Sequence, residues 1–343
     1  MKLENESIFL HSLRSFFVSL FGVVGVVVGL SLAIFLLLGL FSSSSDDKNL
    51  PSKAKLMPNA EGSRKDWGAG TAVLLQIPIE GTIGMGEITP EKIQEILLES
   101  REGSLKNERV KGIILVINSP GGGANDSNII YRQILEYKNR FKVPVYAYTD
   151  GLCASGGYYI ACSADKIYAS TVSLVGSIGV LGWPPYMNVH KTLEKIGVET
   201  KTLFAGKGKD EMNPFRPWQE GETASRQTLV DFYYKNFVDV VSANRPKLSE
   251  SDLVSKYGAH IFPAYQAEEY GLIDKSGVDL SFVIAELARE VGVEEKYQVI
   301  QFKTKSWFKQ MFGGESTSPL FTGTIKHELS MPDRSSVNYL YVP

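Results

Sequence analysis

The chain has 343 residues, of which 43% are hydrophobic, and its 36 Lys and Arg against 38 Asp and Glu give a formal net charge of -2. A chain of this length and composition can bury a substantial core, which excludes an intrinsically disordered protein. The nearly balanced charge and the lack of a basic tract do not support a nucleic-acid-binding surface, so we expect no nucleic-acid partner.

The first predicted element is a transmembrane helix at residues 16–41, which follows a short N-terminal segment, 1–15. The stretch carries no charged residue, and it exceeds the roughly 20 residues that cross a bilayer. A cleaved secretory signal is the alternative, but its apolar region is only about 7–15 residues long. Basic residues lie on both sides of the span, so charge leaves its orientation open.

A polar segment rich in Ser, Pro and Gly, 42–70, predicts a flexible linker to a folded body at 71–303. Short apolar runs in the body predict strands at 72–83, 112–120, 143–150 and 297–302. Helical spacing predicts helices at 89–102, 125–141, after Ser155, and at 218–245, 249–256, 264–270 and 278–292. This alternation indicates an α/β fold with parallel strands and crossover helices. The tail, 304–343, has no sustained periodicity and is predicted to be flexible.

The two cysteines, Cys153 and Cys162, flank one turn. They cannot form a disulfide framework, and we interpret them as small buried apolar residues rather than redox or metal-binding groups. We expect no metal ion and no other cofactor.

The segment GLCASGGYYIACSADKIYAS, residues 151–170, contains the first candidate for chemistry. Ser155 follows a predicted strand and precedes two glycines and an apolar, helix-like run. A serine nucleophile needs an exposed Oγ, a base and backbone donors for an oxyanion, and a strand-to-helix turn can supply those donors. Ser155 is therefore a candidate nucleophile, although a small residue at such a turn can also serve packing alone.

The segment INSPGGGAND, residues 117–126, has three consecutive glycines between a predicted strand and a helix. Such a turn can aim backbone N–H groups at an anion. A phosphate-binding loop is disfavoured because the G-x-x-x-x-G-K-[ST] pattern is absent. An oxyanion pocket fits better, and a glycine-rich loop without a ligand stays open as the alternative.

A base is the third requirement, and histidine supplies it poorly. Of the four histidines, His11 borders the predicted span and His327 lies in the tail. The other two, His190 and His260, have ordinary helical surroundings. Lys207 and Lys209 remain, in a glycine-containing loop at 204–215 after the strand-like ETKTLF. With a reference pKa near 10.4, only about one lysine in 2,500 is neutral at pH 7, and a shift of ~3 units costs on the order of 4 kcal/mol. Burial can supply this shift, whereas the alternative is a charged surface loop.

Four motifs in this order, INSPGGG, CASGGYYIA, VGSIGV and AGKGKDEMNPF, resemble the serine peptidase family of signal peptide peptidase A (SppA) and its relative SohB. The resemblance covers roughly residues 70–300. It implies a Clp/crotonase-like superhelix of repeated ββα units behind an N-terminal transmembrane helix.

The resemblance also implies roles for individual residues. Ser155 would be the nucleophile, Lys209 the base with Lys207 as a neighbour, and Ser177 a residue that orients the lysine. The N–H groups of Gly122 and Gly156 would form the oxyanion hole, with Gly121 as an alternate donor. Gly208 departs from the pattern because relatives often carry a larger residue before the lysine.

The expected function is that of a membrane-anchored serine endopeptidase that degrades cleaved signal peptides or other apolar peptides near the lipid bilayer. The resemblance implies a homo-oligomer whose Ser-Lys dyads are shared between subunits. It also places the catalytic domain on the extracytoplasmic side of a bacterial inner membrane. A crotonase-type acyl-CoA enzyme and a catalytically inactive membrane scaffold of the same fold are the alternatives.

Overall fold

The computed structural model describes residues 54–86, 88–182, 185–302 and 338–340, together with Val18 and Gly22. The predicted span at 16–41 therefore lies outside the described residues except at those two positions. Within the described part of the chain, no helix combines the length and apolarity that crossing a membrane requires. Two compact units are present, Met1–Asn49 and Leu50–Pro343, and the described strands belong to the second.

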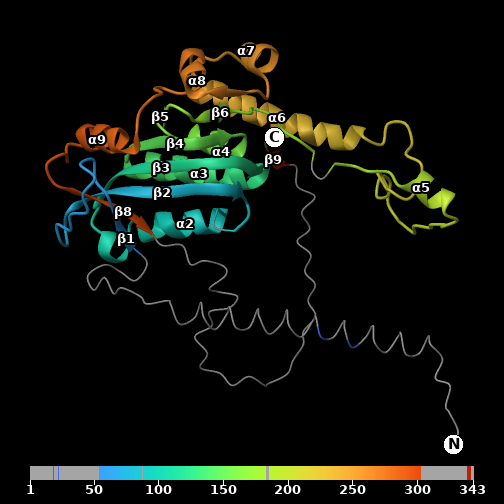
Figure 1. The fold of residues 1–343 in the computed structure, drawn as a ribbon, viewed down its shortest axis with the longest axis horizontal. Helices are drawn as coiled ribbons and strands as arrows, with labels where there is room; N and C mark the ends of the chain where they lie inside the picture. The colour runs from blue at the N-terminus through green and yellow to red at the C-terminus, as the bar shows by residue number, and fades with distance from the viewer. Residues whose placement is uncertain are drawn as a thin grey trace, which may run out of the picture. The chain divides into compact units, whose positions relative to one another are not determined.

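One mixed sheet forms the centre of the second unit, with the strand order β1-β8-β2-β3-β4-β6-β7; β5 pairs with β4, and β9 with β3 (Figure 1). The strands are β1 Ala54–Met57, β2 Ala72–Ile83, β3 Val110–Gly123, β4 Val145–Ala154, β5 Lys166–Ala169, β6 Leu174–Gly176, β7 Ile261–Pro263, β8 Tyr297–Phe302 and β9 Asn338–Leu340. The pairs β8–β2, β2–β3, β3–β4, β4–β5 and β4–β6 are parallel, whereas β1–β8, β6–β7 and β3–β9 are antiparallel.

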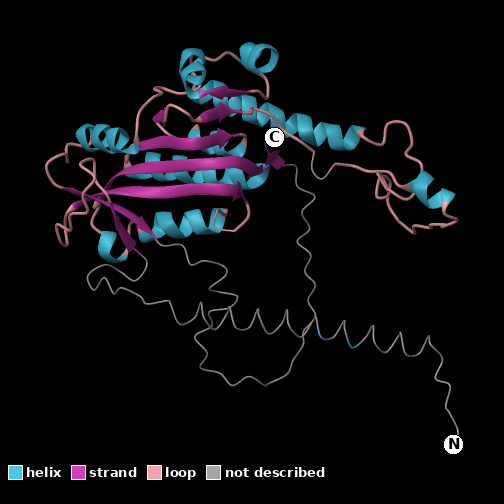
Figure 2. Cartoon of the chain, in the orientation of Figure 1, coloured by secondary structure: helices cyan, strands magenta, loops and turns pink. Residues whose placement is uncertain are grey.

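Helices connect the parallel strands, as the alternating sequence pattern predicts (Figure 2). They are α2 Pro90–Glu99, α3 Ala124–Phe141, α4 Gly156–Ala161, α5 His190–Lys195, α6 Ala224–Asn244, α7 Glu250–Asp252, α8 Ala264–Tyr270 and α9 Leu280–Glu290, with short helical turns at Gly103–Leu105 and Leu253–Tyr257. The Thr89 side chain accepts a hydrogen bond from the Lys92 N–H, and Pro90 opens α2, so this helix begins where its sequence signals predict.

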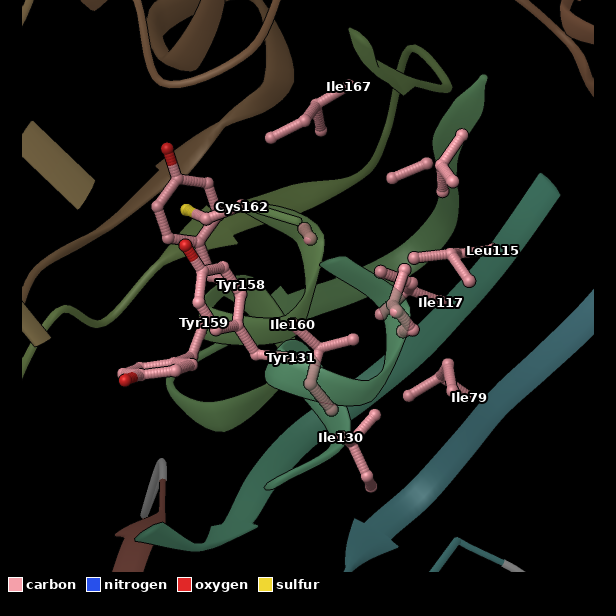
Figure 3. Close-up of a cluster of buried hydrophobic side chains, with 14 of the residues drawn as sticks. Ile79, Leu115, Ile117, Ile130, Tyr131, Tyr158, Tyr159, Ile160, Cys162 and Ile167 are labelled. Carbon is pink, nitrogen blue, oxygen red and sulfur yellow. The ribbon is translucent and has the colours of Figure 1, made fainter. Parts of the chain in front are cut away.

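Both faces of the sheet are buried, which explains why its parallel strands read as apolar runs. Alternate residues of β2 belong to different clusters: Val73 and Leu75 to the larger one, and Leu74 to the smaller one that contains residues of α9. The larger cluster contains residues of α3 and α4, and Figure 3 shows Ile130, Tyr158 and Ile160 grouped with strand residues. The helices thus hold β3 and β4 firmly between two apolar layers.

Cys153 and Cys162 are both buried free thiols, which confirms the interpretation from the sequence. Cys162 lies in the larger apolar cluster (Figure 3). Burial raises the pKa of its thiol to about 12, so the group stays neutral. A neutral, enclosed thiol is a packing group rather than a nucleophile.

Three segments differ from the elements predicted for them, and one is the tail predicted to be flexible, in which β9 pairs with β3. The strand-like ETKTLF, 199–204, forms no strand, because no strand among the described residues pairs with it and its apolar residues face solvent, Leu203 at 86% and Phe204 at 58% exposure. Conversely, β1 lies within the stretch predicted as linker, where it pairs with β8, nearly 250 residues later. A four-residue strand whose partner is so distant leaves no periodic signal in its own sequence.

Leu287 provides a test of the second apolar layer, since it is fully buried and its side chain lies against Gly112 of β3. We expect Leu287→Ala to lower the free energy of unfolding by about 2–4 kcal/mol, because it leaves a cavity between α9 and the sheet. Urea denaturation followed by far-UV circular dichroism measures this change. The matched control Leu98→Ala, at an exposed helical position, should change it by less than about 0.5 kcal/mol; equal losses would contradict the packing described.

Candidate active site

The candidate site lies where two neighbouring parallel strands end. β3 and β4 pair in parallel, so their carboxyl ends meet at one edge of the sheet, and each leads into a helix, α3 or α4 (Figure 1). β3 ends in the three glycines 121–123, and β4 ends one residue before Ser155. The parallel topology thus brings together the glycine turn and the candidate nucleophile.

Ser155 occupies a strained turn between β4 and α4. Its backbone angles are φ 53° and ψ -122°, in the left-handed half of the map that non-glycine residues rarely adopt. Its N–H donates to the Gly176 carbonyl at 2.9 Å, and its own carbonyl accepts from the Tyr159 N–H at 2.9 Å. These two bonds hold the strand-to-helix turn in place.

The Ser155 side chain is fully buried, and its Oγ has no hydrogen-bond partner in the described chain. The sequence predicts an exposed hydroxyl at this position, whereas the structure encloses it. A buried hydroxyl without a partner costs free energy, and most buried polar atoms avoid that state. Strain and an unsatisfied hydroxyl therefore coincide at one residue, a combination that marks functional sites.

Two glycines allow the turns to approach each other. A Cβ on Gly156 would lie 3.3 Å from the Gly122 nitrogen and 2.4 Å from Ser127 Oγ. A Cβ on Gly122 would lie 2.1 Å from the Ile83 carbonyl oxygen, a clash with backbone that side-chain movement cannot relieve. The structure therefore places Gly122 and Gly156, both predicted as oxyanion donors, side by side.

Gly121, predicted as an alternate donor, has its N–H committed elsewhere. It donates to Ser119 Oγ at 3.1 Å. Ser119 was missed by the sequence analysis, and its only signal is a polar residue at the end of a buried apolar strand.

Ser177, predicted to orient the lysine, follows Gly176, whose backbone is hydrogen-bonded to the Ser155 turn. The Gly176 carbonyl accepts the Ser155 N–H, and the Ser177 N–H donates to the His260 carbonyl at 2.7 Å. Ser177 is buried and also has a positive φ of 55°. His260 thus contributes its backbone to this region, while its side chain faces solvent.

Lys209 is not brought to Ser155 within this chain. It lies in an exposed loop where its N–H donates to the Gly206 carbonyl at 3.2 Å, and Lys207 is exposed beside it. Since Ser155 Oγ has no partner among the described residues, no Ser-Lys hydrogen bond joins the two there.

The loop that carries Lys209 is organised by ion pairs rather than by an apolar core. Arg216 Nε contacts the Asp210 carboxylate at 2.5 Å, and Arg216 Nη1 contacts Glu222 at 2.6 Å. Arg216 Nη2 also donates to the Asp210 carbonyl, and the Met212 N–H donates to Glu222. We call Arg216, Asp210 and Glu222 the Arg216 cluster. It fixes the backbone directly after Lys209.

The Arg216 cluster also shifts the acidity of its carboxyl groups. Hydrogen bonds from Arg216 and Asn213 hold the pKa of Asp210 below its ordinary value. Burial raises the pKa of Glu222, but hydrogen bonds from Arg216 and from the Met212 and Gln219 backbones outweigh this and leave it lowered. Both carboxyl groups therefore favour the charged form that Arg216 requires.

The glycine strand also pairs with an extended segment from the C-terminal end of the chain. β9 runs antiparallel to β3, with Gly121, Gly122 and Gly123 opposite Leu340, Tyr339 and Asn338. An extended backbone can therefore form a ladder along the strand edge beside the candidate nucleophile.

Within the described chain, no three His, Cys, Asp or Glu side chains are grouped to hold a metal ion.

Comparisons with known proteins identify relatives among the proteases. A candidate signal peptide peptidase SppA of Enterococcus faecium is 36% identical over 172 residues, 50% of this chain and 49% of that protein. A candidate protease of Methanocaldococcus jannaschii is 36% identical over 174 residues, 51% of this chain and 54% of that protein. The chain thus spans about half the length of these curated relatives.

Protease 4 of Salmonella typhi is 30% identical over 226 residues, 65% of this chain and 35% of that protein. Among solved structures, a ClpP1 N165D mutant from Listeria monocytogenes aligns with a TM-score of 0.39 and 15% identity, over 60% of this chain and 92% of that one, which is too weak a similarity to assign the fold. The pattern of peptidase family S49 matches residues 138–294, which include Ser155, Ser177 and Lys209. The resemblance of this chain to the SppA and SohB proteases is thereby confirmed, with residues 138–294 matching the pattern of peptidase family S49.

Proposed function

We propose that the protein is a serine endopeptidase with a Clp/crotonase-like fold, in which Ser155 is the nucleophile and Lys209 the base. The observation that carries this proposal is the buried Ser155 hydroxyl, which has no hydrogen-bond partner in the described chain and lies on a strained turn beside Gly122. The family match supports the same chemistry from an independent direction.

The proposed reaction proceeds through an acyl-enzyme. Ser155 Oγ bonds to the carbonyl carbon of the peptide while its proton passes to the neutral amine of Lys209. The carbonyl oxygen becomes an oxyanion and accepts hydrogen bonds from the N–H groups of Gly122 and Gly156. Lys209 then gives its proton to the leaving amine as the C–N bond breaks. Water hydrolyses the resulting ester and restores the Ser155 hydroxyl.

We propose that Lys209 serves a Ser155 of a neighbouring subunit. A lysine is a base only when uncharged, and removal from water disfavours its charged form. The exposed position of Lys209 suits this idea, because contact with a second subunit would bury it. Large apolar residues are exposed around the same segment, as an interface would require: Tyr186, Met187, Ile196, Leu203, Phe204, Phe215, Leu229 and Phe232.

The proposed substrates are cleaved signal peptides or other apolar peptides in an extended conformation. The pairing of β9 with the glycine strand supports this substrate class, because an extended peptide could take the place of β9 on the same edge and form backbone hydrogen bonds there. The uncharged stretch at 16–41 supports a single-pass anchor in a bacterial inner membrane. We propose that the catalytic body lies on its extracytoplasmic side.

Mixing two inactive variants tests both the dyad and its sharing. We expect Ser155→Ala and Lys209→Ala each to lower casein or signal-peptide cleavage by at least about 10³-fold. Co-assembled in equal amounts, the two variants should regain about a quarter of wild-type activity, because some interfaces then pair an intact serine with an intact lysine. The initial rate of peptide cleavage by the co-expressed oligomer measures this recovery.

Lys207→Ala is the matched control, since Lys207 is an exposed lysine two residues away in the same loop. It should retain activity within about threefold of wild type. An active Lys209→Ala enzyme would eliminate Lys209 as the base. If mixing restored nothing although each variant assembled normally, the dyad would not be shared.

Membrane topology gives a separate test. We expect a reporter fused after Pro343 to be active if it functions outside the cytoplasm and inactive if it functions only in the cytoplasm. The reason is that the proposed catalytic body lies on the extracytoplasmic side of the span. Alkaline phosphatase and β-galactosidase fusions, compared in the same cells, measure this. Activity of the β-galactosidase fusion alone would place the body in the cytoplasm.

The Arg216 cluster predicts a pH dependence of the Lys209 loop. The lowered pKa values of Asp210 and Glu222 mean that the folded loop favours their charged forms. Their stabilising contribution is therefore complete above the ordinary carboxyl pKa, about 4, and is lost as pH falls through the lower folded values. We expect amide exchange in residues 206–216, corrected for intrinsic rates, to accelerate only below about pH 4.

Arg216→Gln should make amide exchange in the loop fast already at neutral pH, because it removes the partner of both carboxylates. The peptide-cleavage rate should fall by roughly 10-fold or more. Lys235→Gln is the control, because it breaks only the exposed pair with Asp239 on α6. Equal exchange in wild type and Arg216→Gln would refute the role of the cluster.

A further inference from the structure

Ser119 is a buried serine that links the end of β2 to the glycine turn of β3. It is fully enclosed, and its Oγ donates to the Gly81 carbonyl at 2.6 Å and accepts from the Gly121 N–H at 3.1 Å. The hydroxyl therefore uses one donor and one acceptor, both on backbone groups. Neither the Gly81 carbonyl nor the Gly121 N–H belongs to a helix.

The strand pairing around Ser119 explains why a side chain is needed. The register between β2 and β3 shifts between Glu80 and Thr82, and the register between β3 and β4 shifts between Ile117 and Ser119. Such irregularities leave backbone groups without their usual ladder partners. A buried N–H group needs a partner, and the Ser119 hydroxyl serves the buried Gly121 N–H while it donates to the carbonyl of the exposed Gly81.

The hydrogen bond to Ser119 also determines where the glycine N–H groups can act. The Gly121 N–H is held by Ser119, so it is not available to an oxyanion. Gly121 has a φ of 102°, and this conformation sets the direction of the next peptide group, that of Gly122. The hydrogen bond to Ser119 thus holds the peptide group before Gly121. The next peptide group along the chain carries the Gly122 N–H, the candidate oxyanion donor.

Ser119 also lies against the start of α4. A Cβ placed on Gly157 would be 3.2 Å from both the Ser119 Cβ and its carbonyl oxygen. The residue thus contacts the nucleophile turn on one side and orders the glycine turn on the other. Its position couples the two turns whose separation matters for the reaction.

We propose that Ser119 is a positioning residue for the oxyanion site: its hydroxyl withdraws the Gly121 N–H and thereby orients the Gly122 N–H toward the tetrahedral anion. This inference rests on the proposed function, since it concerns the same reaction. Ser119 itself touches no reacting atom and acts only through the backbone of the two glycines.

The experiment compares Ser119→Ala with Ser100→Ala in the full chain. Ser100 is the matched control because it is also fully buried and its hydroxyl also has two partners, the Leu97 carbonyl and the Tyr137 hydroxyl, in a region away from the site. Peptide cleavage gives kcat and KM for each variant. Inhibition constants are measured for an apolar tripeptide aldehyde, which forms a tetrahedral adduct with the serine, and for the corresponding alcohol, which does not.

We expect Ser119→Ala to lower kcat by roughly 10- to 100-fold with KM changed less than about threefold, because only the transition state uses the oriented donor. Affinity for the aldehyde should fall by a similar factor, while affinity for the alcohol stays unchanged. Ser100→Ala should lose thermal stability to a similar extent but keep its kcat. Ser119→Cys, which keeps a γ atom at this position but forms only weak hydrogen bonds, should show the same selective loss and serves if Ser119→Ala does not fold.

An unchanged kcat in Ser119→Ala would overturn the inference while leaving the proposed function intact. So would equal losses of aldehyde and alcohol affinity, since they would mean that the peptide groove, rather than the oxyanion site, had changed. A wild-type protein that neither cleaves peptides nor binds the aldehyde would instead overturn the proposed function, and this inference with it.

Discussion

The close approach of two backbone turns is the constraint on which the candidate site depends. A Cβ on Gly122 would clash with the Ile83 backbone, and a Cβ on Gly156 would clash with the Ser127 hydroxyl and lie only 3.3 Å from the Gly122 nitrogen. Parallel pairing of β3 and β4 brings these turns to one edge of the sheet, and the absence of a Cβ lets them touch. Backbone N–H groups can then lie near a serine hydroxyl, which side chains of ordinary size would prevent.

The turn that carries the candidate nucleophile Ser155 is held firmly although it is locally unfavourable. A non-glycine residue at positive φ and a buried hydroxyl without a partner each cost on the order of 1–3 kcal/mol. Contacts of α4, whose residues are all buried, offset this cost in free energy. The Tyr158 hydroxyl donates to the Leu272 carbonyl at 2.7 Å, and the ring centroids of Tyr159 and Phe237 lie 5.1 Å apart. The surrounding core thus maintains a geometry that the turn would not adopt alone.

The two halves of the proposed dyad have opposite environments. Ser155 is enclosed by apolar layers and backbone, whereas Lys209 lies in an exposed loop that depends on the Arg216 cluster for its shape. Ion pairs at a surface are weak individually, but Arg216 binds two carboxylates and a carbonyl at once, which favours one loop conformation. An organised loop with an exposed lysine suits delivery of the amine to a site formed with another chain.

The sequence by itself determined the elements whose signals are local. The apolar runs at 72–83 and 297–302 are strands, and the helix signals at Thr89 and Pro90 mark the start of α2. The strand-turn-helix pattern around Ser155 is also present as predicted. Each of these features is written in consecutive residues, since periodicity, caps and turn glycines act over only a few positions.

Only the tertiary structure decided which distant groups meet. Nothing in the sequence shows that the His260 carbonyl holds Ser177, that Ser119 engages the Gly121 N–H, or that β1 pairs with β8. It also left ETKTLF open to interpretation as a strand, although no strand in the part of the chain that the structure describes pairs with it. These outcomes depend on strand register and burial, which bring together residues far apart in the chain and therefore leave no mark on either segment alone.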